Sequence, residues 1–165
     1  MSKKQVFFSF HYNRDAWRAS QVRNMGKVDG GSTFSDNDWE EVRYKTDAKI
    51  KEWIDSQLAQ RSCLVVLVGF ETSQRKWVKY EIESAMKLHK GIVGIRINKL
   101  KNEKGEQDSN GSNPFHSIIT SSGYRLSSCV TLFESTYITS TYVYNDIKEN
   151  IESLIEEAIT NRWNY

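Results

Sequence analysis

The sequence predicts an α/β domain in which a parallel sheet of about five strands carries helices on both faces. Two observations support this fold class. Segments typical of strands and of helices alternate four times along the chain, as they do where crossover helices join parallel strands. In addition, Cys63–Val68 is a continuous apolar run without alternation, which is typical of a central strand covered on both faces.

The expected strands are runs of aromatic, β-branched and aliphatic residues bounded by turn-forming residues. The second strand is short, and the last is expected mainly in its 130–133 part. In chain order, the strands are expected at Gln5–Phe10, Ser32–Phe34, Cys63–Val68, Ile92–Ile97 and within Tyr124–Phe133.

The expected helices have apolar residues at helical spacing and begin at side chains that can cap a helix. The expected caps are Asn13, Thr46 or Asp47, Thr72 or Ser73, and Asn145 or Asp146. The helices that follow these caps should cover about 14–27, 47–60 and 74–89 and the chain beyond 146. Gly91 is expected to end the third of them. Residues 135–144 are ambiguous. Residues 98–113 hold almost no apolar side chain, which predicts a mobile surface loop.

Length and composition are ordinary for one soluble domain. The chain has 165 residues, of which 38% are hydrophobic and 27% charged, and its net charge is +2. We expect a single domain over 1–165, whose 117–165 part the sequence leaves unassigned, without the strong charge that attracts nucleic acid. No apolar run approaches a membrane span, and no CxxC pair or signal peptide is found. The expectation is a reduced, cytoplasmic protein that binds neither nucleic acid nor membranes.

In a sheet of this kind, ligands bind beyond the carboxyl ends of the strands. Three loops should therefore meet at one edge of the sheet: Ser9–Asn13, Phe34–Glu41 and Gly69–Gln74. The helix that follows the third loop carries Trp77 and Glu81, which are four residues apart and so lie on one face. Glu81 reaches the edge only if this helix lies across it.

Motifs of several enzyme classes are absent from the sequence. It contains no phosphate-binding GxxxxGK[ST] loop and no GxGxxG, which argues against a nucleoside triphosphatase and a Rossmann dehydrogenase. No Cys/His set has zinc spacing, and Ser9 lacks the G-x-S-x-G context of a hydrolase. Asp36 and Asp38 would suit a response-regulator phosphoacceptor, but the paired acids expected after the first strand are missing.

Two short motifs give the chain a family resemblance. The strand Phe7–Phe10 (FFSF) and the helical Trp77-x-x-x-Glu81 resemble the F-[IV]-S-[FY] strand and the Trp-x-x-x-Glu motif of TIR domains. The pattern over about residues 4–115 is most similar to the TIR-like protein of bacterial Thoeris antiphage defence systems. The resemblance implies a three-layer, flavodoxin-like TIR fold and an enzyme that cleaves NAD between nicotinamide and ribose.

The resemblance also implies a role in signalling. The Thoeris type makes a cyclic ADP-ribose isomer, which activates a separate NAD-depleting effector through the product and not through stable contact. Glu81 matches the catalytic glutamate, and Phe10 and its neighbours match positions that line the substrate. NAD is then the substrate, a phage-derived trigger is an expected partner, and no cofactor is needed. Formation of a homo-oligomer stays open.

The implied chemistry suits a single carboxylate. In NAD the nicotinamide is bonded to the ribose as a positively charged pyridinium, and it departs as a neutral molecule. Neither a general acid nor a metal is therefore required, and one carboxylate can stabilise the cation-like transition state. Phe10, Trp39 or Tyr80 would provide a stacking surface for the substrate. The residues expected to contact the substrate are Ser9, Phe10, His11, Asp36, Trp39 and Tyr80.

Each candidate also has an ordinary structural explanation. A glutamate on an amphipathic helix is usually solvated, Trp77 would fit a core, and His11 would fit a cap at a strand end. Two other functions stay open: a non-enzymatic TIR-like module that acts by self-association or partner docking, and a nucleotide-binding regulator of flavodoxin-like type. The acidic loop Ser35–Glu41 and Val78, where receptor TIR domains usually have cysteine, put receptor-style adaptor binding in doubt.

Overall fold

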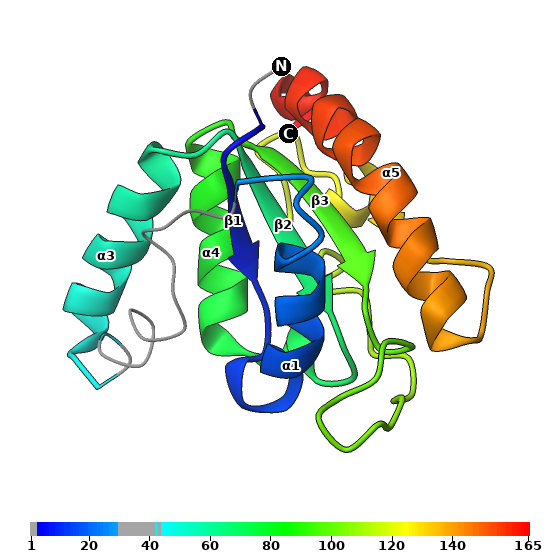
Figure 1. Cartoon of the computed structure of the whole chain (residues 1–165). Coiled ribbons are helices and arrows are strands. Elements are labelled where there is room, and N and C mark those ends of the chain that lie inside the picture. Colours follow the sequence, from blue (N-terminus) through cyan, green and yellow to red (C-terminus); the bar gives the residue numbers. More distant parts are fainter. Residues whose placement is uncertain (1–2, 30–41, 43) are drawn as a thin grey trace.

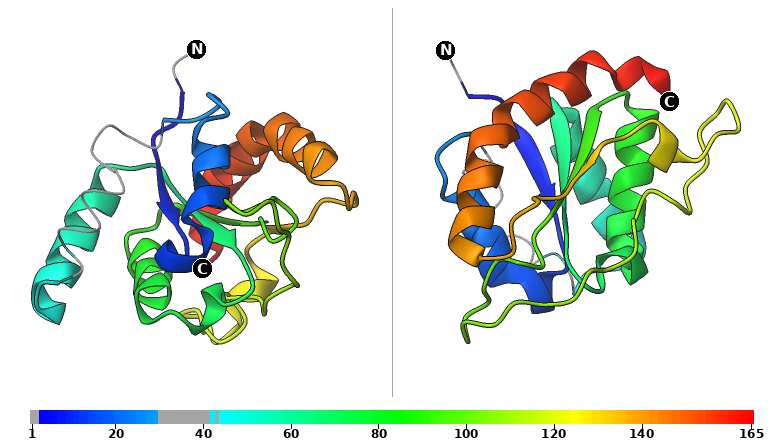
Figure 2. Two further views of the ribbon diagram at one scale, coloured as in Figure 1. Left: turned by 60° about the horizontal axis from the view of Figure 1, so that its bottom comes forward. Right: turned by 90° about the vertical axis from the view of Figure 1, so that its right-hand side faces the viewer.

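The computed structural model describes residues 3–29, 42 and 44–165 of the chain. Its strands form one parallel sheet in the order β1-β2-β3-β4, and helices α1 and α5 cover one face while α3 and α4 cover the other (Figures 1 and 2). The predicted three-layer α/β fold is confirmed. The strands are β1 Val6–Ser9, β2 Cys63–Val68, β3 Gly91–Arg96 and β4 Leu132–Phe133, and the helices are α1 Tyr12–Arg23, α3 Asp47–Ala59, α4 Lys76–Lys87 and α5 Ser140–Thr160.

The described sheet has four strands where about five were expected. The strand expected at Ser32–Phe34 lies outside the described residues. Just before it, Asp29 forms a parallel bridge with Gln5, on the side of β1 opposite to β2. At the other edge, β4 is much shorter than the segment predicted to contain it and pairs only with Gly94 and Ile95 of β3.

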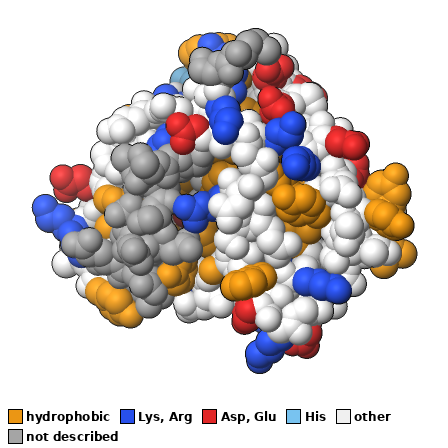
Figure 3. Space-filling model, in the orientation of Figure 1, with side chains coloured by type: hydrophobic (Ala, Val, Ile, Leu, Met, Phe, Trp, Pro, Cys, Tyr) orange, Lys and Arg blue, Asp and Glu red, His pale blue; other side chains and the backbone are white. Residues whose placement is uncertain are grey.

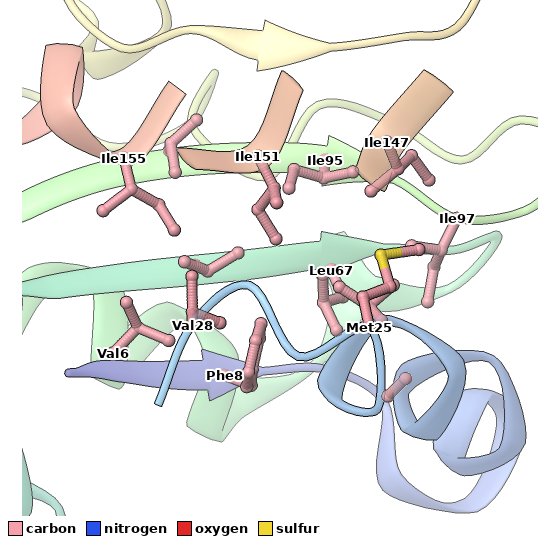
Figure 4. Packing of buried hydrophobic residues seen from close by; sticks show 14 of the residues in the cluster. Val6, Phe8, Met25, Val28, Leu67, Ile95, Ile97, Ile147, Ile151 and Ile155 are labelled. Carbon is pink, nitrogen blue, oxygen red and sulfur yellow. The ribbon is translucent and has the colours of Figure 1, made fainter. Parts of the chain in front are cut away.

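The central strand β2 contributes side chains to two separate hydrophobic clusters. Every second residue from Cys63 to Leu67 packs with α1 and α5, and the intervening residues from Leu64 to Val68 pack with α3 and α4. All of β2 is buried because helices cover both of its faces, as its unbroken apolar sequence predicted. Figure 4 shows the first cluster, to which successive turns of α5 contribute Ile147, Ile151 and Ile155.

Two helices begin earlier than predicted, while a third begins as expected. His11 and not Asn13 caps α1, because His11 Nδ1 accepts a hydrogen bond from the backbone nitrogen of Arg14 at 3.1 Å. α5 begins at Ser140, inside the segment that the sequence left ambiguous. The predicted cap of α3 is confirmed, since the Thr46 hydroxyl accepts from the third residue of that helix.

The turn after β2 does not cap α4 in the predicted way. Thr72 begins a short 3₁₀ helix, Thr72–Gln74, and its hydroxyl accepts a hydrogen bond from the Gly69 nitrogen at 2.7 Å. The helix α4 starts only at Lys76 and has no side-chain cap. Glu81 therefore lies about one and a half helical turns from the start of α4, close to the carboxyl ends of the strands.

The end of α4 also differs from the prediction. His89 adopts a left-handed conformation with φ of 52°, and the Lys90 nitrogen donates to the Ala85 carbonyl at 3.0 Å, which closes the helix before Gly91. Gly91 is instead the first residue of β3. A Cβ atom there would lie 2.9 Å from the backbone nitrogen of Ile159, so the glycine permits the close approach of α5.

Residues 98–113, which were expected to form a mobile surface loop, are attached to the domain at several points. The Arg18 guanidinium donates to the carbonyls of Leu100 at 2.8 Å and Glu106 at 2.9 Å. Gly111 packs so closely on the turn after β2 that a Cβ atom there would overlap the carbonyls of that turn. These contacts hold the segment against α1 and the carboxyl end of β2, and its mobility stays a prediction.

The surface carries both signs of charge. Basic and acidic side chains are interspersed on the face in Figure 3, in keeping with a net charge of +2. Exposed apolar side chains gather at the right edge of that view. Among the exposed apolar residues are Tyr137 and Ile138, just before α5, and Tyr142 in its first turn. Within the part of the chain that the structure describes, no helix has both the length and the apolar character needed to cross a membrane.

Candidate active site

Glu81 lies on α4 beside the carboxyl end of β1. The residue is only 7% exposed. The hydroxyl of Ser9, the last residue of β1, lies close enough to favour the charged form of its carboxyl group. Ser9 is also buried, and its Oγ makes no hydrogen bond of standard geometry to any described residue. In Figure 1 the helix α4 runs alongside the sheet and antiparallel to β1, so Glu81 reaches this edge because it lies near the start of α4, and the helix does not have to lie across the edge as we expected.

The sequence of α4 explains why Glu81 faces the sheet. Val78 and Ala85 are buried in the cluster between the sheet and α3/α4. Glu81 is three residues after Val78 and four before Ala85, so it shares their face of the helix. Ser9 faces the same side of the sheet as Phe7, which belongs to the same cluster, because side chains two apart on a strand share a face.

The environment of Glu81 favours its neutral form. Burial raises the pKa of Glu81 well above the ordinary value of a glutamate, and the nearby Ser9 hydroxyl opposes this shift without reversing it. No Lys or Arg among the described residues forms an ion pair with Glu81. Carboxyl groups with strongly shifted pKa values concentrate at functional sites. In this arrangement a ligand hydroxyl would find Glu81 without a competing cation.

His11 lies two residues beyond Ser9 and faces the turn after β2. Because Nδ1 caps α1, the other ring nitrogen is the one directed outward, and His11 Nε2 lies 3.5 Å from Oε2 of Glu71. Burial, and then the positive charge of Arg75, lower the pKa of His11. His11 is therefore neutral at pH near 7 and can donate one hydrogen bond through Nε2.

The structure does not bring Phe10 and Tyr80 to Glu81. Phe10 packs against the cluster under α1 and α5, on the other face of the sheet, and stacks on Tyr12 with ring centroids 6.5 Å apart. The Tyr80 hydroxyl donates to Asp55 of α3 at 2.9 Å, and burial together with this contact raises the pKa of Tyr80 to about 12. Tyr80 thus joins α4 to α3, and the expected stacking roles of both residues stay predictions.

Two further candidates, Asp36 and Trp39, lie outside the described residues, so their contact with a substrate stays a prediction. Trp77 is half-buried against the α3/α4 cluster, with its ring centroid 6.0 Å from that of Tyr80 in an edge-on contact. These contacts support a structural role for Trp77. In residues 3–29, 42 and 44–165, no three His, Cys, Asp or Glu side chains are grouped to hold a metal ion.

The prediction missed a buried ion pair next to the site. Asp15 and Arg18 are 0% and 2% exposed, and Arg18 Nη1 donates to Asp15 Oδ1 at 2.8 Å. The second carboxylate oxygen of Asp15 has no hydrogen-bond partner in the described part of the chain, and a Cβ atom on Gly69 would overlap it. Opposite charges three residues apart, in a predicted helix with few apolar residues, were the available signal.

The chain is similar to a known protein family and to a known bacterial protein. A family model described as the TIR-like domain of Thoeris protein ThsB matches residues 7–102, which include Ser9 and Glu81. The chain is also 36% identical over 130 residues to a Bacillus cereus (strain MSX-D12) protein named "Putative cyclic ADP-D-ribose synthase ThsB1". That match covers 76% of this chain and 66% of the length of the relative. The chain therefore belongs to the family of TIR-like domains of the Thoeris protein ThsB.

Proposed function

We propose that the chain cleaves NAD between nicotinamide and ribose and cyclises the remaining ADP-ribose, with Glu81 as the essential carboxylate. The observation that carries this proposal is the buried carboxyl group of Glu81 beside Ser9, at the edge of the sheet where ligands bind in folds of this class. The name of the Bacillus cereus relative, which describes a cyclic ADP-D-ribose synthase, supports the proposed product.

Glu81 acts on the ribose in this mechanism. The bond between the anomeric carbon and the pyridinium nitrogen breaks, its electron pair leaves with neutral nicotinamide, and positive charge develops on the ribose. An ionised carboxylate beside the ring stabilises this charge electrostatically. Hydrogen bonds from the ribose hydroxyls would favour the ionised form of Glu81, which offsets the effect of burial on its pKa.

Cyclisation needs a second nucleophile from the same molecule. A hydroxyl or a purine nitrogen of the ADP-ribose attacks the anomeric carbon, and the site must exclude water for this attack to compete with hydrolysis. The cyclic product then activates a separate NAD-depleting effector. A phage-derived trigger that acts on this chain therefore affects the effector through the product, without stable contact between the chain and the effector.

The test is incubation with NAD, in the presence and absence of a lysate from phage-infected cells, followed by separation of the products with mass detection. We expect nicotinamide together with a product one water lighter than ADP-ribose. Linear ADP-ribose as the only nucleotide product would support cleavage and contradict cyclisation. Absence of nicotinamide in both conditions would contradict the enzyme and favour a non-enzymatic TIR-like module.

A further inference from the structure

A single carboxylate, that of Glu71, stands between two groups that can bind an anion at the carboxyl ends of β1 and β2. Its Oε2 lies 3.5 Å from Nε2 of His11 and 3.7 Å from Nη1 of Arg14. Both distances are longer than a normal hydrogen bond. The side chains of Glu71 and Arg14 are 38% and 37% exposed, so water screens the pairing. Glu71 is therefore held loosely by the groups that it contacts.

Arg14, in contrast, is held by other groups. Its Nε donates to Asp108 at 2.8 Å, and its guanidinium lies over the ring of Phe70, 5.1 Å from the ring centroid. A charge-assisted hydrogen bond and a cation–π contact together fix the plane of the guanidinium. If Glu71 moved away, Arg14 would stay in place with Nη1 facing the position that the carboxylate had occupied.

His11 is fixed in a similar way. Its Nδ1 is committed to the start of α1, its side chain is buried, and only Nε2 faces Glu71. The exposed guanidinium of Arg75 lies close enough to affect the charge of His11. Two donor groups, His11 and the permanently cationic Arg14, therefore face a place that a carboxylate now occupies, and the positive charge of Arg75 lies near His11.

We propose that Glu71 occupies the place of the substrate's diphosphate and so sets the affinity of the site for an anionic dinucleotide. The inference rests on the proposed function: with the ribose at Glu81 and Ser9, the diphosphate, which is attached to the ribose 5′-carbon, extends toward His11. Glu71 swings away when the diphosphate binds to His11 and Arg14. It acts as a built-in competitor that weakens NAD binding, and it has no part in the bond cleavage itself.

The test measures NAD binding by titration calorimetry in the inactive Glu81→Gln background, with and without Glu71→Gln. We expect the added substitution to tighten NAD binding about three- to tenfold, and the gain to shrink as salt is raised. Nicotinamide riboside, which lacks the diphosphate, should gain nothing. Glu103→Gln, the same charge change on an exposed residue of 98–113, serves as the control and should leave NAD binding unchanged.

A second measurement uses the protein with Glu81 intact. Glu71→Gln should lower the KM for NAD and leave kcat unchanged, because Glu71 does not touch the reacting atoms. If nicotinamide is released but neither the KM nor the affinity for NAD changes, the role of Glu71 is wrong and the proposed function stands. An equal gain for nicotinamide riboside would also overturn this role. If the wild type neither releases nicotinamide nor binds NAD, both the proposed function and the role of Glu71 are wrong.

Discussion

The hydroxyl of Ser9 at the end of β1 lies against the buried carboxyl group of Glu81 on α4. This contact joins two motifs that are far apart in the sequence. Burial raises the pKa of Glu81, whereas Ser9 favours the charged form. The balance between these two effects sets the pH above which Glu81 is ionised and able to stabilise a cationic transition state.

Replacing Ser9 with alanine should shift the pH profile of the proposed reaction, so that the rise of kcat/KM on its acid side, the acid limb, occurs at higher pH. The substitution removes the group that favours the charged carboxylate, so the pKa of Glu81 rises further and a higher pH is needed to ionise it. The measurement is the pH dependence of kcat/KM for nicotinamide release. Ser62→Ala, at an exposed serine before β2, is the control, and an unmoved acid limb in Ser9→Ala would contradict the role of the contact.

Glu81→Gln should stabilise the protein at alkaline pH. Since the pKa of Glu81 is raised in the folded state, the folded protein holds this proton more tightly than the unfolded chain. The stability that this group contributes is thus complete below the ordinary carboxyl pKa and is lost as the pH rises through the folded value. Glutamine cannot ionise, so the variant should gain about 1 kcal/mol in free energy of unfolding at alkaline pH and nothing in acid.

Urea unfolding of Glu81→Gln and wild type at the two pH values measures this difference. Glu83→Gln, two residues further along α4, controls for the loss of a charge from the same helix. Equal stability of Glu81→Gln and wild type at alkaline pH would show that burial does not penalise the charged form of Glu81.

Arg18→Met should destabilise the fold strongly. The substitution removes three hydrogen bonds, to Asp15, Leu100 and Glu106, and leaves the carboxylate of Asp15 buried without its partner. Breaking one side of a buried ion pair typically costs about 3–5 kcal/mol. Chemical denaturation measures the loss, and Lys79→Met on the exposed face of α4 should cost less than about 0.5 kcal/mol. A loss for Arg18→Met as small as that of the control would contradict this prediction.

Gly69→Ala should destabilise the protein by about 2 kcal/mol. A Cβ atom at residue 69 would overlap the carboxylate of Asp15, which Arg18 holds in place. The specific prediction is a coupling: the same change should cost much less when residue 15 is already alanine. A double-mutant cycle from urea unfolding measures this coupling, and Ser73→Ala in the same turn is the control. Equal costs in the two backgrounds would exclude the overlap as the cause.

The parts of the fold that could be predicted are those with a local signal. The unbroken apolar run of β2 predicted a strand covered on both faces, and Thr46 before an amphipathic segment predicted the start of α3. The predicted start of α1 was wrong because asparagine is the more usual cap, whereas in the structure the His11 ring accepts the capping hydrogen bond. The end of α4 was wrong because His89 adopted the left-handed conformation that usually belongs to glycine.

The site could be predicted where a motif and the sheet geometry agreed. Glu81 came from its motif and the edge of the sheet from the parallel strands, whereas the position of Glu81 at that edge depended on how α4 lies, which the sequence left open. The surroundings of two neighbours follow from simple geometry: Phe10 is next to Ser9 on an extended segment and points to the opposite face, and Tyr80 points to α3 because consecutive helical residues diverge. Their expected contacts with a substrate stay predictions. The contacts of Arg18 with residues 98–113 depend on segments far apart in the chain, which no local pattern reveals.

One carboxylate, that of Glu81, carries the proposed cleavage of NAD. The most direct test compares the rate of nicotinamide release by wild type, Glu81→Gln and Glu83→Gln, with circular dichroism to show that all three are folded. We predict that Glu81→Gln loses at least about a hundredfold in rate and that Glu83→Gln stays close to wild type. Release by Glu81→Gln within about twofold of wild type, a difference too small for a lost transition-state contact, would contradict the assignment.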